Sequence, residues 1–300
     1  MPDHRYAFGG FVIRSMLVLP ELDATDAADG ALGQIQIDTG DVPGRIEGEQ
    51  IAPNVTASAH ALIFEINGVG RFWIREGRSI TVSPAPGAAE ADLRPFILGS
   101  ALGAICIQRG ILAFHASAIV SRGRAAAFLG HRGAGKSTLI AGLAARGMVP
   151  LSDDLTIVTR EGAAGPLAFP GVPRVKLLPD AAQALDIAGQ TRELTEQPKL
   201  LLRLPSWQQD PVPLDILFLL EDEPDGSHAI RIERLEGDQA VQAVAPHLYR
   251  SHWAPKGALL LRRMAELKRL CRQVCVRRLS RPKRFEHIAD VADLVATQFG

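Results

Sequence analysis

Residues 125–137 read AAAFLGHRGAGKS, and this stretch decides the fold. It holds the full pattern G-x-x-x-x-G-K-[ST] from Gly130 to Ser137, directly after a short apolar run that predicts a strand. Residues 138–146 continue with a helical pattern that should end at Gly147. Strand, glycine-rich loop and helix together predict the core unit of a nucleotide-binding α/β domain.

Each part of this loop has a mechanical reason. Glycines 130, 133 and 135 let successive backbone N–H groups turn toward phosphates, and the following helix presents its positive N-terminal end to the same anion. Lys136 is expected to reach the β- and γ-phosphates of ATP, and the Ser137 hydroxyl is expected to bind Mg²⁺. The residues expected to hold Mg·ATP are Gly130, His131, Arg132, Gly133, Ala134, Gly135, Lys136, Ser137 and Thr138.

An acidic pair follows the loop along the chain. Residues 149–158 predict a strand that carries Asp153 and Asp154. Adjacent residues on a strand point to opposite faces, so the two carboxylates should have different roles. We expect Asp153 to help Ser137 hold Mg²⁺ and Asp154 to accept the proton of an incoming hydroxyl as the general base. A solvated turn is the alternative interpretation of the pair.

The remaining chain predicts two domains. Residues 1–88 read as a mainly β domain, with strands at 11–13, 34–37, 61–66 and 70–74, and the Pro- and Gly-rich stretch 83–89 is a plausible junction. Residues 89–300 read as the α/β domain that contains the loop. Its further expected elements are helices at 90–109, 256–272 and 287–298 and strands at 111–120, 125–129, 214–220 and 274–279.

Composition limits the partners and the compartment. The 33 basic and 33 acidic side chains balance, which argues against a nucleic-acid or membrane partner. Cys106, Cys271 and Cys275 are too few for a disulfide framework and lack the spacing of a metal site. Without an apolar signal core near the N-terminus, a cytoplasmic protein is expected. The stretch 262–284 carries ten Lys or Arg residues against one acid, which predicts a solvated face or, alternatively, a docking surface.

These motifs resemble the HPr kinase/phosphorylase family, whose P-loop domain phosphorylates a serine on a small carrier protein. The resemblance rests on 114–117 (Phe-His-Ala-Ser), on the glycine-rich loop and on 152–154 (Ser-Asp-Asp). It implies that Asp154 is the general base and that His115 and Lys136 belong to the active site. The chain differs from the family at His131, Arg132 and Thr138, and in 169–177, where the family has a glycine-rich segment with a metal-binding glutamate.

A closer resemblance is to HPr-kinase-like proteins that phosphorylate the C-terminal serine of lasso-peptide precursors. Its landmarks span nearly the whole chain: 6–10 (Tyr-Ala-Phe-Gly-Gly), 13–15, 19–22, 108–110 (Gln-Arg-Gly) and 170–177 (Pro-Gly-Val-Pro-Arg-Val-Lys-Leu). The resemblance implies a peptide or protein substrate with an acceptor serine, and it leaves a homo-oligomer open.

Two other functions are compatible with the same motifs. One is a kinase for a carrier protein or small molecule, and the other is a non-catalytic binding module that ATP organises through 262–284. A kinase also needs a cation beside the transferred phosphate in addition to Lys136. The candidates for this cation are Arg132, Arg174, Lys176, Lys199 and Arg203.

Overall fold

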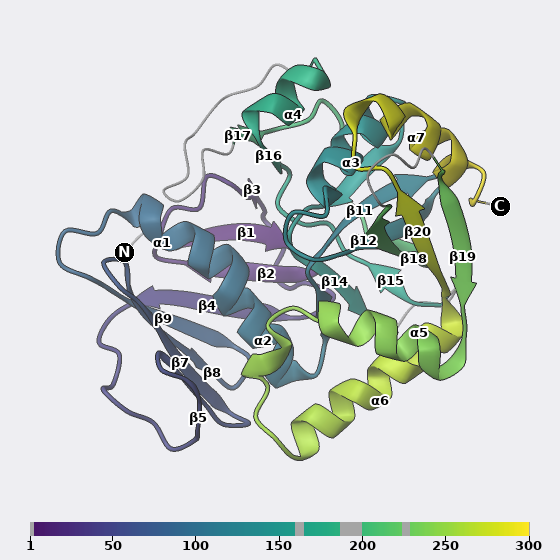
Figure 1. Ribbon diagram of the computed structural model, residues 1–300. Coiled ribbons are helices and arrows are strands. Elements are labelled where there is room, and N and C mark those ends of the chain that lie inside the picture. Colours follow the sequence, from purple (N-terminus) through teal and green to yellow (C-terminus); the bar gives the residue numbers. More distant parts are fainter. Residues whose placement is uncertain (1–2, 160–164, 187–199, 224–228, 300) are drawn as a thin grey trace. The chain divides into compact units, whose positions relative to one another are not determined.

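The computed structural model describes residues 3–159, 165–186, 200–223 and 229–299 (Figure 1). Its internal contacts divide the chain into two units. Unit 1 is Met1–Ala113 with Leu248–Glu266, and unit 2 is Phe114–His247 with Leu267–Gly300. The expected boundary near residue 88 therefore lies inside unit 1, and a segment distant in sequence also joins that unit. The predicted mixture of helices with large sheets is confirmed.

Unit 1 is built on one large sheet, as its alternating apolar pattern predicts. In the described residues the strand order is β3-β1-β2-β4-β9-β8-β7-β6-β5, antiparallel except for the β2/β4 and β4/β9 pairs. The strands are β1 (His4–Phe8), β2 (Phe11–Ser15), β3 (Asp23–Ala24), β4 (Gln34–Thr39), β5 (Glu49–Ala52), β6 (Val55–Ala57), β7 (Ala61–Ile66), β8 (Gly70–Arg75) and β9 (Ser79–Pro84).

A helix follows this sheet where the sequence predicts one. It comprises α1 (Glu90–Phe96), a π turn (Ile97–Ala101) and α2 (Leu102–Arg109), and it ends at Gly110, whose φ of 68° is the left-handed conformation of a helix cap. Two side chains at its end fix it to the sheet unit. Gln108 accepts a hydrogen bond from Gly77 N and donates to Ile74 O, and Arg109 donates to Gln34 O. These contacts explain why residues 89–113 belong with the β strands.

The returning segment completes unit 1 by packing against the same helix and sheet. Tyr249 lies so close to Gly103 that a Cβ there would meet its ring at 2.6 Å, and Arg250 donates to Ser100. Trp253, in a 3-10 turn (Ser251–Trp253), has its ring centre 5.0 Å from that of Phe64. Any residue with a side chain at position 103 would therefore clash with the ring of Tyr249.

Unit 2 contains the glycine-rich loop on a mixed sheet with the order β14-β15-β18-β12-β11-β13, and β20 pairs with both β18 and β19. Its strands are β11 (Ala116–Ser121), β12 (Arg124–Leu129), β13 (Val149–Ser152), β14 (Thr156–Thr159), β15 (Leu167–Ala168), β18 (Val212–Asp222), β19 (Arg231–Leu235) and β20 (Cys275–Arg281). A separate pair is β16 (Val175–Leu177) with β17 (Leu200–Leu202). Two elements span the division between the units: β10 (Leu112–Phe114) and α6 (Ala258–Gln273).

Helices cover this sheet and enclose the core. They are α3 (Lys136–Ala144), α4 (Pro179–Ala184), α5 (Gly237–Val244), a 3-10 turn (Ala245–His247), a 3-10 turn (Phe285–His287) and α7 (Ile288–Ala296). Phe128 and Phe218 stack at 5.2 Å in the interior, and α3 and α7 pack against each other. No helix in the described ranges is both long enough and apolar enough to cross a membrane.

The parallel pairing in unit 2 decides where a ligand can bind. Strands β12 and β20 both run parallel to β18, so their carboxyl ends reach the same edge of the sheet. In open α/β sheets ligands bind at this edge. The glycine-rich loop follows β12 there, and Arg281 is the last residue of β20.

Two predicted strands are interrupted. The predicted strand 111–120 is two strands, β10 and β11, with His115 between them, and 149–158 is β13 and β14 with the acidic pair between them. Asp154 has a φ of 76°, a left-handed conformation that ends a strand and that aspartate tolerates better than most residues. The prediction that Asp153 and Asp154 lie within one strand is therefore wrong.

Candidate active site

The loop between β12 and α3 has a backbone that depends on its glycines. Gly133 and Gly135 have φ values of 89° and 79°, and a Cβ on Gly130 would meet Ala134 Cβ at 2.9 Å. Helix α3 begins at Lys136, two residues earlier than predicted, so Lys136 and Ser137 lie in its first turn. The first-turn N–H groups of a helix have no intrahelical acceptor and attract anions.

Lys136 folds back over the loop. Its Nζ donates to the carbonyl oxygens of Gly130 at 2.8 Å and His131 at 3.1 Å, and only 7% of the residue is exposed. The ammonium group is thus held at the centre of the loop by oxygens of the loop itself. A phosphate bound there would replace carbonyl contacts with stronger contacts to a charged acceptor.

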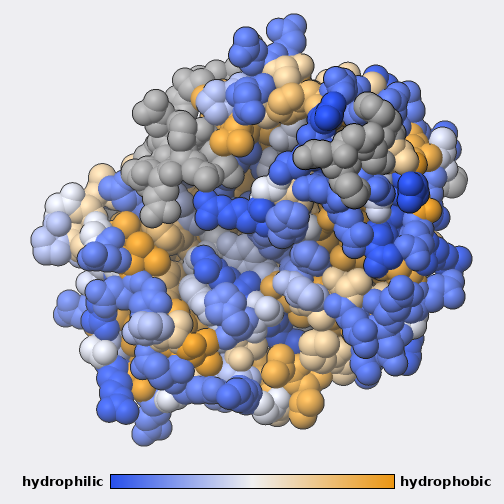
Figure 2. All heavy atoms as spheres, viewed as in Figure 1, coloured by the Kyte–Doolittle hydropathy of each residue, from blue (hydrophilic) through white to orange (hydrophobic). Residues whose placement is uncertain are grey.

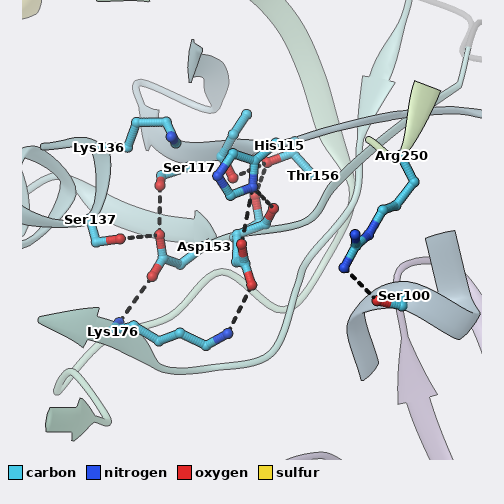
Figure 3. Close-up of polar contacts among 12 residues, drawn as sticks. Ser100, His115, Ser117, Lys136, Ser137, Asp153, Thr156, Lys176 and Arg250 are labelled. Atoms are coloured by element: carbon cyan, nitrogen blue, oxygen red, sulfur yellow. Dashed lines mark hydrogen bonds and ion pairs between the residues drawn. The ribbon is translucent and has the colours of Figure 1, made fainter. Parts of the chain in front are cut away.

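Asp153 is the point on which the site converges (Figure 3). Its Oδ1 accepts hydrogen bonds from Ser137 Oγ at 2.8 Å and Ser117 Oγ at 2.6 Å, and its Oδ2 accepts one from the backbone N of Lys176 at 3.0 Å. The carboxylate is buried, with 7% exposure of the residue. Ser137 and Asp153, the two residues expected to hold Mg²⁺, are hydrogen-bonded to each other.

The side chain of Asp154 contacts different partners from those of Asp153. The two side chains diverge because the backbone turns at Asp154, and not because they alternate along one strand. Its Oδ2 accepts from Lys176 Nζ at 2.8 Å, and its Oδ1 lies 3.1 Å from His115 Nδ1. Burial acts to raise the pKa of Asp154, but the positive charge of Lys176 and the hydrogen bond from His115 outweigh it, so the pKa lies below the ordinary value. Asp154 is therefore ionised at neutral pH.

Lys176 reaches the acidic pair because of the segment before it. Gly171 N donates to Leu151 O at 2.8 Å, and a Cβ on Gly171 would meet Ser152 Cα at 3.1 Å. This close approach holds the start of 170–177 against the strand that precedes the acidic pair, and β16 then presents Lys176 to both carboxylates. Residues 170–177 thus supply a lysine to the site.

A second histidine lies at the site and has no signal in the sequence. The carbonyl of His247 accepts a hydrogen bond from His115 N at 2.9 Å. Burial, followed by the charges of Lys136, His115 and His131, lowers the pKa of His247 to about 4. His247 is therefore neutral at pH 7 beside a site that already carries several cations.

A cavity of about 750 Å³ opens over the loop and the acidic pair. Of the nine expected loop residues, those that line it are Arg132, Gly133, Gly135, Lys136, Ser137 and Thr138. Its cationic side chains are Arg132, Lys136, Lys176, Arg281, Lys283 and Arg284, against the acids Asp153, Asp154 and Asp180. This excess of positive charge suits a polyanion such as a triphosphate.

The cavity lining distinguishes among the five residues that the sequence offered as a phosphate-binding cation. Arg132 and Lys176 line it, whereas Arg174 and Arg203 are not among its described lining residues. Lys199 lies outside the described residues. Of the two candidates that line the cavity, Lys176 is the one that pairs with Asp154.

Arg281 is a site residue that the sequence analysis missed. Its Nη2 donates to Ala134 O in the loop at 2.8 Å, and the residue is only 6% exposed. Burial lowers the pKa of this guanidinium, although its ordinary value is so high that it stays charged. The signal that could have found it is its place at the carboxyl end of a strand in the same parallel set as the loop.

Part of the basic stretch 262–284 is buried or paired with acids. Arg263 and Arg281 are buried, and Arg278 pairs with Glu221 and Glu233 from the neighbouring strands β18 and β19. In Figure 2 the surface over β19 and β20 is largely hydrophilic. Acidic residues that are distant in the sequence therefore neutralise part of the positive charge of the stretch 262–284.

The donor set beside the loop fits a hard divalent cation. Ser137 and Asp153 offer a hydroxyl and a carboxylate oxygen, the ligands that Mg²⁺ accepts together with substrate phosphates and water. Among the described residues there is no group of three or more His, Cys, Asp or Glu side chains that could hold a metal ion. A cation at Ser137 and Asp153 would thus need oxygens from a bound ligand as well.

Comparisons with known proteins were made for the whole chain. No protein-family model and no curated protein matches it. Among solved structures, the chain is similar to the Hpr(Ser) kinase/phosphatase from Coxiella burnetii, with 12% sequence identity and a TM-score of 0.33. The match covers 62% of this chain and 95% of that one.

Proposed function

We propose that this chain is a kinase that uses ATP and Mg²⁺ to phosphorylate a serine hydroxyl. The observation that carries the proposal is the Ser137–Asp153–Lys176–Asp154 cluster. It joins the first turn of α3 to a second, ionised carboxylate through contacts of 2.8–3.0 Å. A phosphate site and a candidate proton acceptor thus lie next to each other in one cavity.

The triphosphate would lie on residues 130–138. The loop N–H groups and the N-terminal end of α3 would bind its oxygens, and Lys136 would leave the carbonyls of Gly130 and His131 for the β- and γ-phosphates. Ser137 and Asp153 would hold Mg²⁺, which would neutralise negative charge on the triphosphate. Ser117 would keep the Asp153 carboxylate in its orientation through its 2.6 Å hydrogen bond.

Asp154 would position and deprotonate the acceptor. The serine Oγ forms a bond to the γ-phosphorus, the bond to the β,γ-bridging oxygen breaks, and the hydroxyl proton passes to Asp154. The pKa of Asp154 is lowered, so the carboxylate is ionised and ready to accept a hydrogen bond from the hydroxyl. Its role as a base becomes favourable only as the hydroxyl gains acidity during transfer.

Lys176 would supply the additional cation for the transferred phosphate. Its Nζ is 2.8 Å from Asp154, so a small movement brings it to the oxygens of a group attached to the acceptor. His115 holds the other oxygen of Asp154 at 3.1 Å. In this arrangement three side chains that are far apart in the sequence meet at the point of transfer.

For the acceptor, we propose the C-terminal serine of a lasso-peptide precursor. This part rests on the sequence landmarks given above and on charge. The cationic side chains that line the cavity outnumber its acidic ones, and such an excess of positive charge attracts a terminal carboxylate. Peptide affinity should therefore weaken as salt is added.

The direct test is incubation of the purified protein with ATP, Mg²⁺ and a precursor peptide that ends in serine, followed by mass spectrometry. One added phosphate on the terminal serine is expected, and amidation of the C-terminus should raise KM. The matched control is a peptide that ends in alanine. A phosphate found only on a carrier protein or a small metabolite would refute the lasso-precursor acceptor and leave the kinase proposal standing. ATP consumption without any phosphorylated product would favour the binding module.

A further inference from the structure

The cavity contains an exposed aromatic side chain that phosphoryl transfer does not use. Leu178 and Phe285 line it and are 43% and 42% exposed. Across the described residues only two other large apolar side chains, Val18 and Leu261, are comparably exposed. Two of the four large apolar side chains that are exposed in the described residues thus line a cavity that is otherwise rich in charge. This combination indicates a ligand that has an apolar face as well as a charged part.

The segment that carries Phe285 is fixed at both ends to the phosphate-loop side of the site. At its start, Arg281 donates to Ala134 O in the loop at 2.8 Å. At its end, Ile288 packs so closely on α3 that a Cβ on Gly142 would meet its Cγ2 at 2.2 Å. Residues 281–288 therefore run from the loop to the second turn of α3, and Phe285 lies between these two anchors.

Leu178 lies on a different part of the lining. It follows Lys176 by two residues, and Lys176 donates a hydrogen bond to Asp154. Leu178 is thus associated with the acceptor side, whereas Phe285 is associated with the loop and the first turns of α3. A nucleotide whose triphosphate lies on 130–138 with its γ-phosphate toward Asp154 would extend its base away from Asp154. Phe285 is an exposed aromatic side chain in the same lining.

We propose that Phe285 is the surface on which the base of the bound nucleotide stacks. The inference rests on the proposed function, because it takes the anion on the loop to be a nucleoside triphosphate. Flat aromatic ligands gain dispersion and quadrupole contacts against an aromatic ring, and nucleobases stack on such rings with little dependence on the base. Pro282 and Ile288, each three residues from Phe285 in the sequence, also line the cavity and are apolar.

The test compares two ligands that share the phosphates and differ in the base. The dissociation constants of Mg·ATP and of inorganic tripolyphosphate with Mg²⁺ are measured by calorimetry for the full chain. Phe285→Ala should weaken ATP binding about tenfold and leave tripolyphosphate binding unchanged. Phe285→Trp should restore ATP binding. Leu261→Ala, which removes an apolar side chain that is 72% exposed elsewhere, is the matched control and should change neither constant.

The possible results separate the inference from the proposed function. Unchanged ATP binding by Phe285→Ala would overturn the inference, and so would an equal loss for ATP and tripolyphosphate, which indicates a disturbed phosphate loop. A higher KM for the acceptor with unchanged ATP binding would place Phe285 on the acceptor side and overturn it as well. If the wild-type chain bound neither ATP nor tripolyphosphate, the nucleotide site and the inference would both be wrong.

Discussion

Asp154→Asn should slow phosphoryl transfer about a hundredfold or more and keep the affinity for Mg·ATP within a few fold. The amide has nearly the shape of the carboxylate, and its oxygen can still accept the 2.8 Å hydrogen bond from Lys176. It cannot take up a proton from the acceptor hydroxyl. The partners of the Asp154 side chain are His115 and Lys176 rather than residues of the loop, so nucleotide binding should change little.

The size of the loss follows from the role assigned to Asp154. A positioned general base contributes about 10²- to 10⁴-fold to a rate, which corresponds to about 2.7–5.4 kcal/mol of transition-state stabilisation. The lowered pKa of Asp154 makes it a weak base, so the loss should lie toward the lower end of this range. Removal of its negative charge also leaves Lys176 less neutralised, which should favour the triphosphate slightly.

Two measurements on the same sample check this prediction: calorimetry for Mg·ATP and a mass-spectrometric transfer assay. Asp180→Asn is the matched control, because Asp180 also lines the cavity and its carboxylate accepts a local hydrogen bond from Ala181 N. That variant should remain active. Strong loss of ATP binding in Asp154→Asn, together with full activity of Asp153→Asn, would show that the two roles are reversed.

Three further predictions follow from the same contacts. Lys136→Ala should abolish ATP binding and transfer with an unchanged circular dichroism spectrum, and unaltered binding would show that the nucleotide site lies elsewhere. Asp153→Asn should raise the Mg²⁺ concentration needed for half-maximal activity at least tenfold, because it weakens the pair with Ser137. The pKa of His247 is about 4, below the ordinary 6.5, so the unfolded state binds more protons between these values. Urea unfolding should therefore show stability falling as pH drops from 6.5 to 4, and falling less in His247→Gln.

The sequence predicted the centre of unit 2 well because the determinants there are local. An apolar run of five residues, glycines at fixed spacing and a helical pattern are each readable within one turn or strand. The structure has β12, the loop and α3 in this order, and it brings Ser137, Asp153, His115 and Asp154 into one cluster. The chemical roles of these residues stay predictions.

What the sequence did not predict depends on contacts between distant segments. The pattern of 149–158 is apolar enough for one strand, and only the left-handed backbone of Asp154 ends it. Arg281 appeared as one cation among ten, and its burial against Ala134 O follows from the parallel pairing of β18 with β20. The choice of Lys176 among five candidates likewise required the close approach of Gly171 to Ser152.

The composition of unit 1 from two chain segments has a consequence for its synthesis. Tyr249, Arg250 and Trp253 belong to unit 1 and pack against residues of its first segment, Met1–Ala113. The ribosome therefore synthesises residues 114–247 of unit 2 before it adds these side chains. The N-terminal sheet would be synthesised first. Gly103 and Phe64 would lack their contacts with Tyr249 and Trp253 while more than a hundred further residues are translated. A fragment that ends near residue 88 or 113 should accordingly aggregate when expressed alone, and joining residues 248–266 to it through a short linker is the change that should make it soluble.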